Sequence, residues 1–138
     1  MAVKFDITGI PELVTDLTTM AAKLENGPGV DRALQAGAAP IERQMRANAS
    51  RDPKIITGAL HGSIHAYKPQ RGRRGGKYIQ VGVRTKERSA YYSNPVEYGH
   101  GGPAPAPPHP FVRPAFDAQV EHAYGEICRV LADEITRR

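Results

Sequence analysis

The sequence is poor in cysteine and contains no long apolar run. Its 138 residues include one cysteine, Cys128, which excludes an intramolecular disulfide and a cysteine-based zinc site. No stretch approaches the roughly 18 to 20 apolar residues of a membrane span. The first residues also lack the basic stretch and apolar run of a signal peptide. We therefore expect a soluble protein, compatible with a reducing cytoplasm, that does not contact a membrane.

The chain also lacks the motifs of common enzyme classes: a phosphate-binding glycine loop, a nucleophile elbow and an HExxH pattern. His61 and His65 are four residues apart, but at the ends of a strand they would be too far apart to chelate a metal. Cys128 lies beside an apolar helical stripe, which favours a small buried or half-buried residue over a nucleophile. We therefore predict no enzymatic activity, no catalytic residue, no metal and no cofactor.

The N-terminal part predicts a short strand followed by two helices. Apolar and polar residues alternate over Val3–Ile7, which indicates a strand. Pro11 suits the first position of an amphipathic helix that ends at Asn26–Gly29. A second helical pattern runs from about Val30 to Ala49.

Proline and small residues interrupt this second helical pattern. Proline inside a helix costs about 3 kcal/mol, so Pro40 predicts a kink near Gly37 or two abutting helices. Gly37, Ala38 and Ala39 would let a neighbouring element approach closely.

The middle of the chain predicts a hairpin. A capped turn over Thr57–Ser63 leads into a strand over Ser63–Lys68, and a second strand covers Lys77–Arg84. The loop from Pro69 to Gly76 joins them. Alternation in the second strand implies one buried face, formed by Ile79, Val81 and Val83.

The last third begins irregularly and ends in a long helix. Ala90–Gly99 predicts a short strand or a helical turn, since Pro95 favours an edge strand or a turn. The proline-rich arm that follows is extended, and is either a strap between subunits or a stiff connector. From Pro114 an apolar stripe predicts a helix, with Phe116, Val120, Ala123, Ile127, Val130, Leu131 and Ile135 on one face.

These elements predict an α+β fold. A small antiparallel sheet, made of the hairpin and edge strands, packs against two N-terminal helices and a long C-terminal helix. The chain shows no repeat and no domain linker, so residues 1–138 form a single domain. It carries a mobile basic hairpin tip at residues 69–77 and the proline-rich arm at residues 101–110.

Positive charge is concentrated at the hairpin tip. The net charge is +5, and much of the excess comes from Arg71, Arg73, Arg74 and Lys77. The tip either meets DNA phosphates or an acidic partner surface, or is a solvated loop that keeps the protein soluble. No aromatic residue lies among the arginines to stack on bases.

The alternative function is a small basic nucleic-acid-binding protein or a toxin-type ribonuclease. In the ribonuclease, the arginines of the tip would hold phosphates, and His65, Glu97 or Tyr92 would move protons. The basic residues gather in one loop while the helices carry mixed charge, unlike a helix that reads a groove of DNA.

Four motifs, in order along the chain, carry a resemblance to a known family. They are Phe5–Leu13 (FDITGIPEL), Thr57–Ile64 (TGALHGSI), Val96–Gly99 (VEYG) and Pro110–Ala115 (PFVRPA). Together they resemble the head-to-tail joining or tail completion proteins of long-tailed double-stranded DNA bacteriophages and prophages. The chain departs from that pattern at His61, where the family more often has arginine, and in its unusually long proline arm.

The resemblance implies a structural virion component at the neck or tail terminus, present in the host cytoplasm during assembly. It implies a hexameric ring that contacts the tail tube protein and the head connector or head completion protein, with DNA passing the lumen. The motif positions would be structural: Thr57, Gly58, Leu60, Ser63, Ile64, Glu97, Gly99, Pro110, Phe111, Arg113, Pro114 and Ala115.

The residues themselves give several of these positions a mechanical role. Thr57 would cap the turn, Gly58 would allow an unusual backbone angle, and Leu60 and Ile64 would point into the core. Phe111 would plug the core where the last helix begins. The carboxylate of Glu97 accepts backbone hydrogen bonds, pairs with an arginine such as Arg113, or is solvated.

Overall fold

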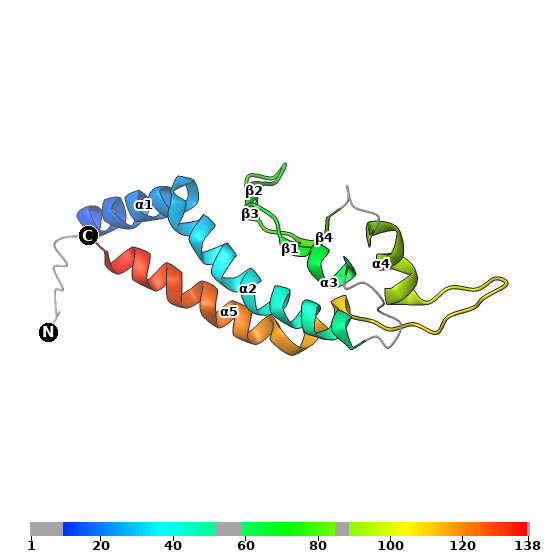
Figure 1. The fold of residues 1–138 in the computed structure, drawn as a ribbon. Coiled ribbons are helices and arrows are strands. Elements are labelled where there is room, and N and C mark those ends of the chain that lie inside the picture. Colours follow the sequence, from blue (N-terminus) through cyan, green and yellow to red (C-terminus); the bar gives the residue numbers. More distant parts are fainter. Residues whose placement is uncertain (1–9, 52–58, 85–88, 138) are drawn as a thin grey trace, which may run out of the picture.

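The computed structural model describes residues 10–51, 59–84 and 89–137, and this part of the chain is mostly helical with two small antiparallel sheets (Figure 1). The elements are α1 (Ile10–Asn26), α2 (Pro28–Ser50), α3 (Ala59–Ser63), β1 (Ile64–Ala66), β2 (Gln70–Arg71), β3 (Lys77–Tyr78), β4 (Val81–Val83), α4 (Ser89–Tyr98) and α5 (Val112–Thr136). The predicted α+β class is confirmed. The strand predicted at Val3–Ile7 lies outside the described residues.

Helices α2 and α5 lie side by side and form the long axis of the molecule (Figure 1). Their close approach depends on Gly37, because a Cβ there would lie 2.5 Å from Cγ1 of Ile127. Helix α2 runs without a break through Pro40, so the predicted alternative of two abutting helices is wrong. Gly37, Ala38 and Pro40 are all buried, and this packing offsets the hydrogen bond that proline removes.

The predicted hairpin is present, but its strands are shorter than predicted. Strand β1 pairs antiparallel with β4, with Ile64 opposite Val83, and β2 pairs with β3. Between the two sheets the amide of Tyr67 donates to the carbonyl of Gln80 at 2.8 Å, which keeps one ladder in register. Ser63 belongs to α3 and not to the strand, because the chain enters the hairpin from a helical turn.

Helix α4 corrects the interpretation of the segment before the proline-rich arm. Ser89–Tyr98 is helical and includes Pro95, so the strand alternative is wrong and the helical turn extends over ten residues. Helix α5 begins at Val112, slightly before the predicted start at Pro114. Proline is tolerated early in α5, where the first amides have no partner within the helix.

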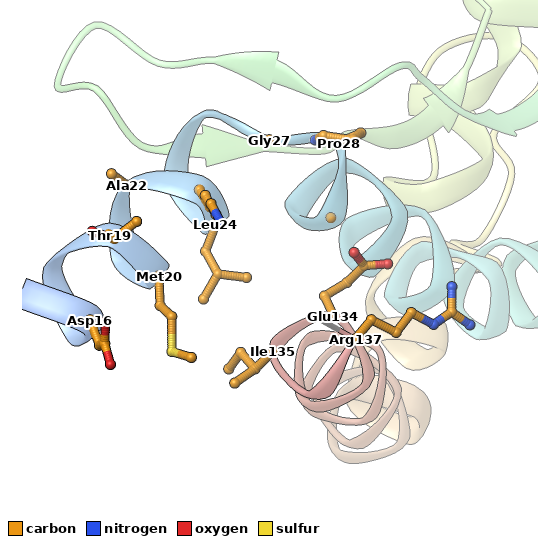
Figure 2. A pocket seen from close by; sticks show the side chains of 12 residues that line it. Asp16, Thr19, Met20, Ala22, Leu24, Gly27, Pro28, Glu134, Ile135 and Arg137 are labelled. Atoms are coloured by element: carbon orange, nitrogen blue, oxygen red, sulfur yellow. The ribbon is translucent and has the colours of Figure 1, made fainter. Parts of the chain in front are cut away.

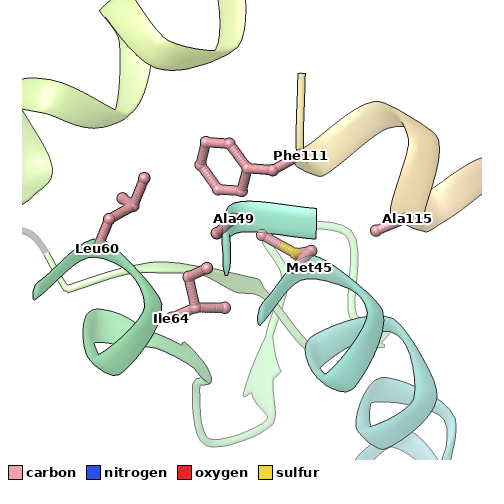
Figure 3. Packing of buried hydrophobic residues seen from close by; sticks show 6 residues of the cluster. All are labelled: Met45, Ala49, Leu60, Ile64, Phe111 and Ala115. Carbon is pink, nitrogen blue, oxygen red and sulfur yellow. The ribbon is translucent and has the colours of Figure 1, made fainter. Parts of the chain in front are cut away.

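The core lies where α2, α3, β1 and the start of α5 meet (Figure 3). Phe111, Met45 and Ile64 are its largest fully buried side chains. The apolar stripe of α5 is buried only in part: Ala123 is enclosed, but Phe116 is 51% exposed and Val120 37% exposed. The predicted stripe is therefore helical, but its large side chains are at most half-buried.

Candidate functional site

The carboxylate of Glu97 lies at the start of α5 and accepts three backbone hydrogen bonds. Its Oε2 accepts from the amides of Phe111 at 2.7 Å and Val112 at 3.0 Å, and its Oε1 accepts from that of Arg113 at 3.2 Å. These amides have no partner within the helix, and the positive end of the helix dipole favours a carboxylate there. Of the three roles predicted for the Glu97 carboxylate, the structure shows the acceptor of backbone hydrogen bonds. Arg113 contributes only its backbone amide to this contact, and its side chain is exposed.

The two ends of the proline-rich arm are held together beside Glu97. Gly99 has φ +71°, and a Cβ there would lie 2.8 Å from the carbonyl oxygen of Ala106. His100 and Ala106 exchange backbone hydrogen bonds, and the amide of His109 donates to the carbonyl of Val96 at 2.8 Å. The arm is therefore a projecting loop with a closed base, and residues 101–105 at its tip are exposed (Figure 1).

The other motif residues gather around the same point. Leu60, Ile64, Phe111 and Ala115 belong to one buried cluster, and the buried hydroxyl of Ser63 donates to the carbonyl of Leu60 at 2.9 Å. Pro110 and Pro114 are exposed beside this cluster. Thr57 and Gly58 lie outside the described residues. Three of the four motifs thus meet where the arm leaves the core.

The basic hairpin tip separates into two parts. Arg71, Arg73 and Arg74 are exposed, with Arg73 and Arg74 at the turn. Lys77 is different: its Nζ lies 2.9 Å from Oδ1 of Asp31 and 3.2 Å from the carbonyl oxygen of Gly27. Lys77 therefore anchors the hairpin to the start of α2, a role that the charge pattern did not predict.

The proton-transfer residues of the ribonuclease alternative do not form a recognisable centre in the described part. Both carboxylate oxygens of Glu97 are used by α5, and the ring of His65 packs on Tyr67 with centroids 4.1 Å apart. The side chain of Tyr92 lies outside the described residues. Among the residues that are described, no three His, Cys, Asp or Glu side chains are grouped for a metal ion. Cys128 is exposed, so the prediction of a buried or half-buried thiol is wrong.

An apolar groove runs along α5, with α2 as its floor and the hairpin as its other wall. It holds about 350 Å³ and is open to solvent. The residues that line it are Leu34, Gly37, Ala38, Ile41, Met45, Ile79, Val81, Val112, Phe116, Val120, Ala123, Tyr124 and Ile127. The large exposed side chains of α5 are therefore not scattered, because most of them face this groove.

Another face of α5 is charged. Arg129 contacts Glu126 at 2.9 Å and Asp133 at 3.5 Å. The hydrogen bond from Arg129, with its positive charge, lowers the pKa of the Glu126 carboxyl below its ordinary value, and the pKa of Arg129 is raised in return. Charge on this face and apolar side chains in the groove give α5 two distinct surfaces.

In the part of the chain that the structure describes, helix α1 also has large apolar side chains that are exposed. Met20 and Leu24 face Ile135 of α5 across an open cleft (Figure 2). Leu13, Val14 and Leu17 are each more than half exposed. The sequence predicted that α1 is amphipathic, but an apolar face does not indicate whether the same chain or another one covers it.

None of the helices in the described ranges is both long enough and apolar enough to cross a membrane. No curated protein and no solved structure matches the chain. Residues 14–99, more than half of the chain, match the family model described as "Bacteriophage HK97-gp10, putative tail-component". The match runs from within α1 to the end of α4, and it agrees with the phage tail resemblance of the motifs. The chain therefore belongs to the HK97-gp10-like family of bacteriophage tail components.

Proposed function

We propose that this phage tail component is a ring-forming tail completion or head-tail joining subunit at the neck or tail terminus of the virion. The observation that carries the proposal is the uncovered apolar surface of α1 and α5. Soluble monomers rarely expose large continuous apolar patches, and such patches mark interaction surfaces. A subunit that must bind neighbours on two sides needs such surfaces on different elements.

The partners we propose are further copies of the chain in a hexameric ring, the tail tube protein, and the head connector or head completion protein. The proline-rich arm supports this proposal. Its base is closed by the pairing of His100 with Ala106, so its tip is held away from the body (Figure 1). An extended proline-rich segment is already stiff and loses little entropy when it docks, which suits a strap between subunits.

The exposed arginines of the hairpin tip support a contact with phosphate groups or with an acidic partner. Arg73 and Arg74 are exposed at the turn, while Lys77 fixes the hairpin to α2. In a ring this tip would meet DNA passing the lumen, or the acidic surface of a neighbouring layer. Contacts with DNA would involve phosphates only and weaken with salt.

We propose no catalytic residue, cofactor or metal for this function. The matched family is described as a tail component, and both oxygens of the Glu97 carboxylate already accept hydrogen bonds from backbone amides at the start of α5. The ribonuclease alternative makes one clear prediction. RNA cleavage by the pure chain that disappears in His65→Ala would favour it over the structural role.

The function is tested in the phage or prophage that encodes the chain. Removing the gene should leave filled heads and separate tails, visible by electron microscopy, and a plasmid copy should restore joined particles. Joined, infectious particles without the protein would contradict the proposal. Normal joining combined with a loss of RNA cleavage would favour the alternative.

The mass of the pure chain gives a second test. Light scattering after size exclusion, over a concentration series with and without short duplex DNA, should show a rise toward a ring that does not depend on DNA. A monomer that changes mass only with DNA would favour a nucleic-acid-binding protein.

A further inference from the structure

We propose that α1 of one copy docks into the apolar groove between α5 and the hairpin of the next copy. The inference rests on the proposed ring and names the contact that builds it. Each copy would offer one helix and one groove, so the interface joins different surfaces of neighbouring subunits. Such head-to-tail contacts generate rings when the rotation between subunits closes.

The groove is long enough for the apolar face of α1. The α5 side runs from Val112 to Ile127, which is roughly 22 Å at about 1.5 Å per residue. The apolar face of α1 runs from Leu13 to Leu24, which by the same rise is roughly 16 Å. One amphipathic helix laid in an apolar groove is a common mode of recognition, with anchors at helical spacing.

The anchors are available on α1 because, within the described residues, its first apolar side chains are largely exposed. Leu13 and Leu17 are each 56% exposed, and they lie one turn apart on the same face. Only the later part of that face, at Met20 and Leu24, turns toward Ile135 at the far end of α5 (Figure 2). The first apolar side chains of α1 are therefore exposed, although the helix lies near the end of α5 (Figure 1).

Charge also favours this pairing. Helix α1 carries three carboxylates, at Glu12, Asp16 and Glu25, and one lysine, so its net charge is −2 (one positive minus three negative). The hairpin beside the groove carries Lys68, Arg71, Arg73, Arg74 and Lys77 over residues 68–77 without a carboxylate. The contact of Lys77 with Asp31 holds this basic segment one turn before Leu34, which lines the groove.

The opposite charges further fix the direction in which α1 would lie. Glu12 and Asp16 are in the first two turns of α1. Arg71 pairs with Lys77, which contacts Asp31, so this basic segment lies at the Leu34 end of the groove. We therefore place the start of α1 toward the hairpin tip of the neighbour. Complementary charge of this kind sets register and speeds association.

A cross-link between two single-cysteine variants tests the contact. In full-length Cys128→Ser protein, Leu17→Cys is made in one sample and Val120→Cys in another, and the two are mixed under mild oxidation. We expect a disulfide-linked dimer of twice the 15.0 kDa of one chain. Neither variant alone should form it, because two α1 helices or two grooves do not meet. Tyr98→Cys, at an exposed site on α4, replaces Val120→Cys in the control and should give no product.

A charge-blocking pair gives an independent measurement by light scattering. Leu17→Asp and Val120→Asp should each raise the dissociation constant by on the order of tenfold or more, since each places a charge in an apolar contact. Their equimolar mixture should recover one productive contact and stop at a dimer. Both positions are exposed in the single chain, so circular dichroism should show an unchanged fold.

Three outcomes would overturn the inference, and a fourth would overturn only the proposed function. Dimers from Leu17→Cys alone would mean that two α1 helices face each other. A monomer carrying both cysteines that closes an internal disulfide would mean that α1 folds into its own groove. If no cross-link forms while gene removal still separates heads from tails, the interface is wrong and the proposed function stands. If the cross-link forms but particles join without the protein, the interface is right and the function is wrong.

Discussion

At Glu97 a distant side chain does the work that a local capping residue does in most helices. Phe111, the residue before α5, has a buried apolar side chain and makes no side-chain capping hydrogen bond. The first amides of α5 are instead bound by a carboxylate 14 to 16 residues earlier in the chain. One residue therefore connects α4, the base of the proline-rich arm and α5.

Replacing Glu97 by glutamine should lower the free energy of unfolding by about 1–2 kcal/mol, because the charge opposite the helix dipole and one good acceptor are lost. Urea unfolding followed by circular dichroism measures the change as a lower midpoint with an unchanged slope. Glu121→Gln, at an exposed site on α5, is the matched control and should change little. Equal losses in both variants would show that the capping contacts do not matter.

Single residues could be predicted from the sequence only where the signal is local. The apolar positions Leu60, Ile64 and Phe111 were predicted to be buried, and they are. The anchor between Lys77 and Asp31 was not predicted, because a basic cluster does not reveal which member pairs with a residue 46 positions away. Burial of Cys128 was predicted wrongly, since it lies next to an apolar stripe but not on the part that packs.

At the scale of elements, the packing of α2 on α5 depends on small side chains. Gly37 has no room for a methyl group, because a Cβ would approach Cγ1 and Cδ1 of Ile127 to 2.5 and 2.7 Å and the carbonyl of Ala123 to 3.1 Å. Gly125, on α5, has nothing within 4 Å of the same added atom. The two glycines therefore allow one substitution to be compared in two environments.

We expect opposite signs for alanine at these two positions. Gly125→Ala should raise the free energy of unfolding by about 0.5–1 kcal/mol through helix propensity. Gly37→Ala should lower the free energy of unfolding by about 1 kcal/mol or more, because the cost of overpacking against Ile127 exceeds the gain in helix propensity. Thermal and urea unfolding of both variants measure the difference. Stabilisation by both would mean that α5 moves away from α2 at little cost.

The long helices could be predicted because their apolar period and end signals are local, as at Pro11 and Pro114. Helix α4 could not, because Pro95 argues against a helix and the packing of Val96 and Glu97 that outweighs it involves distant residues. The strands came out shorter than the alternation indicated. Alternation of apolar and polar residues indicates which face of a strand is buried. It does not indicate where a twisted strand stops forming hydrogen bonds with its partner strand.

At the scale of the whole molecule, the described part is elongated, and different elements lie at its two ends. Helix α1 lies at one end of the pair of long helices, and α4 with the proline-rich arm lies at the other (Figure 1). The apolar groove and the basic hairpin lie between them. The surfaces that we propose for neighbours are thus spread along the molecule, which suits a subunit that is contacted from several sides.

Shortening the arm at its tip should weaken assembly without changing the stability of the single chain. Replacing residues 101–105 by Asn-Gly removes the exposed tip and leaves a turn that suits the pairing of His100 with Ala106. We expect an unchanged melting temperature and a lower mass in light scattering at equal concentration. Equal assembly of the short-arm protein would remove the strap from the proposed function and leave the arm as a connector.

The exposed thiol of Cys128 gives each copy of the protein one chemical handle. Because it is the only cysteine in the sequence, a maleimide dye would attach once per subunit and need no substitution. The number of bleaching steps in a single fluorescent particle would then count the copies that it contains. A surface that has no part in the proposed contacts thus makes the stoichiometry of the assembly directly measurable.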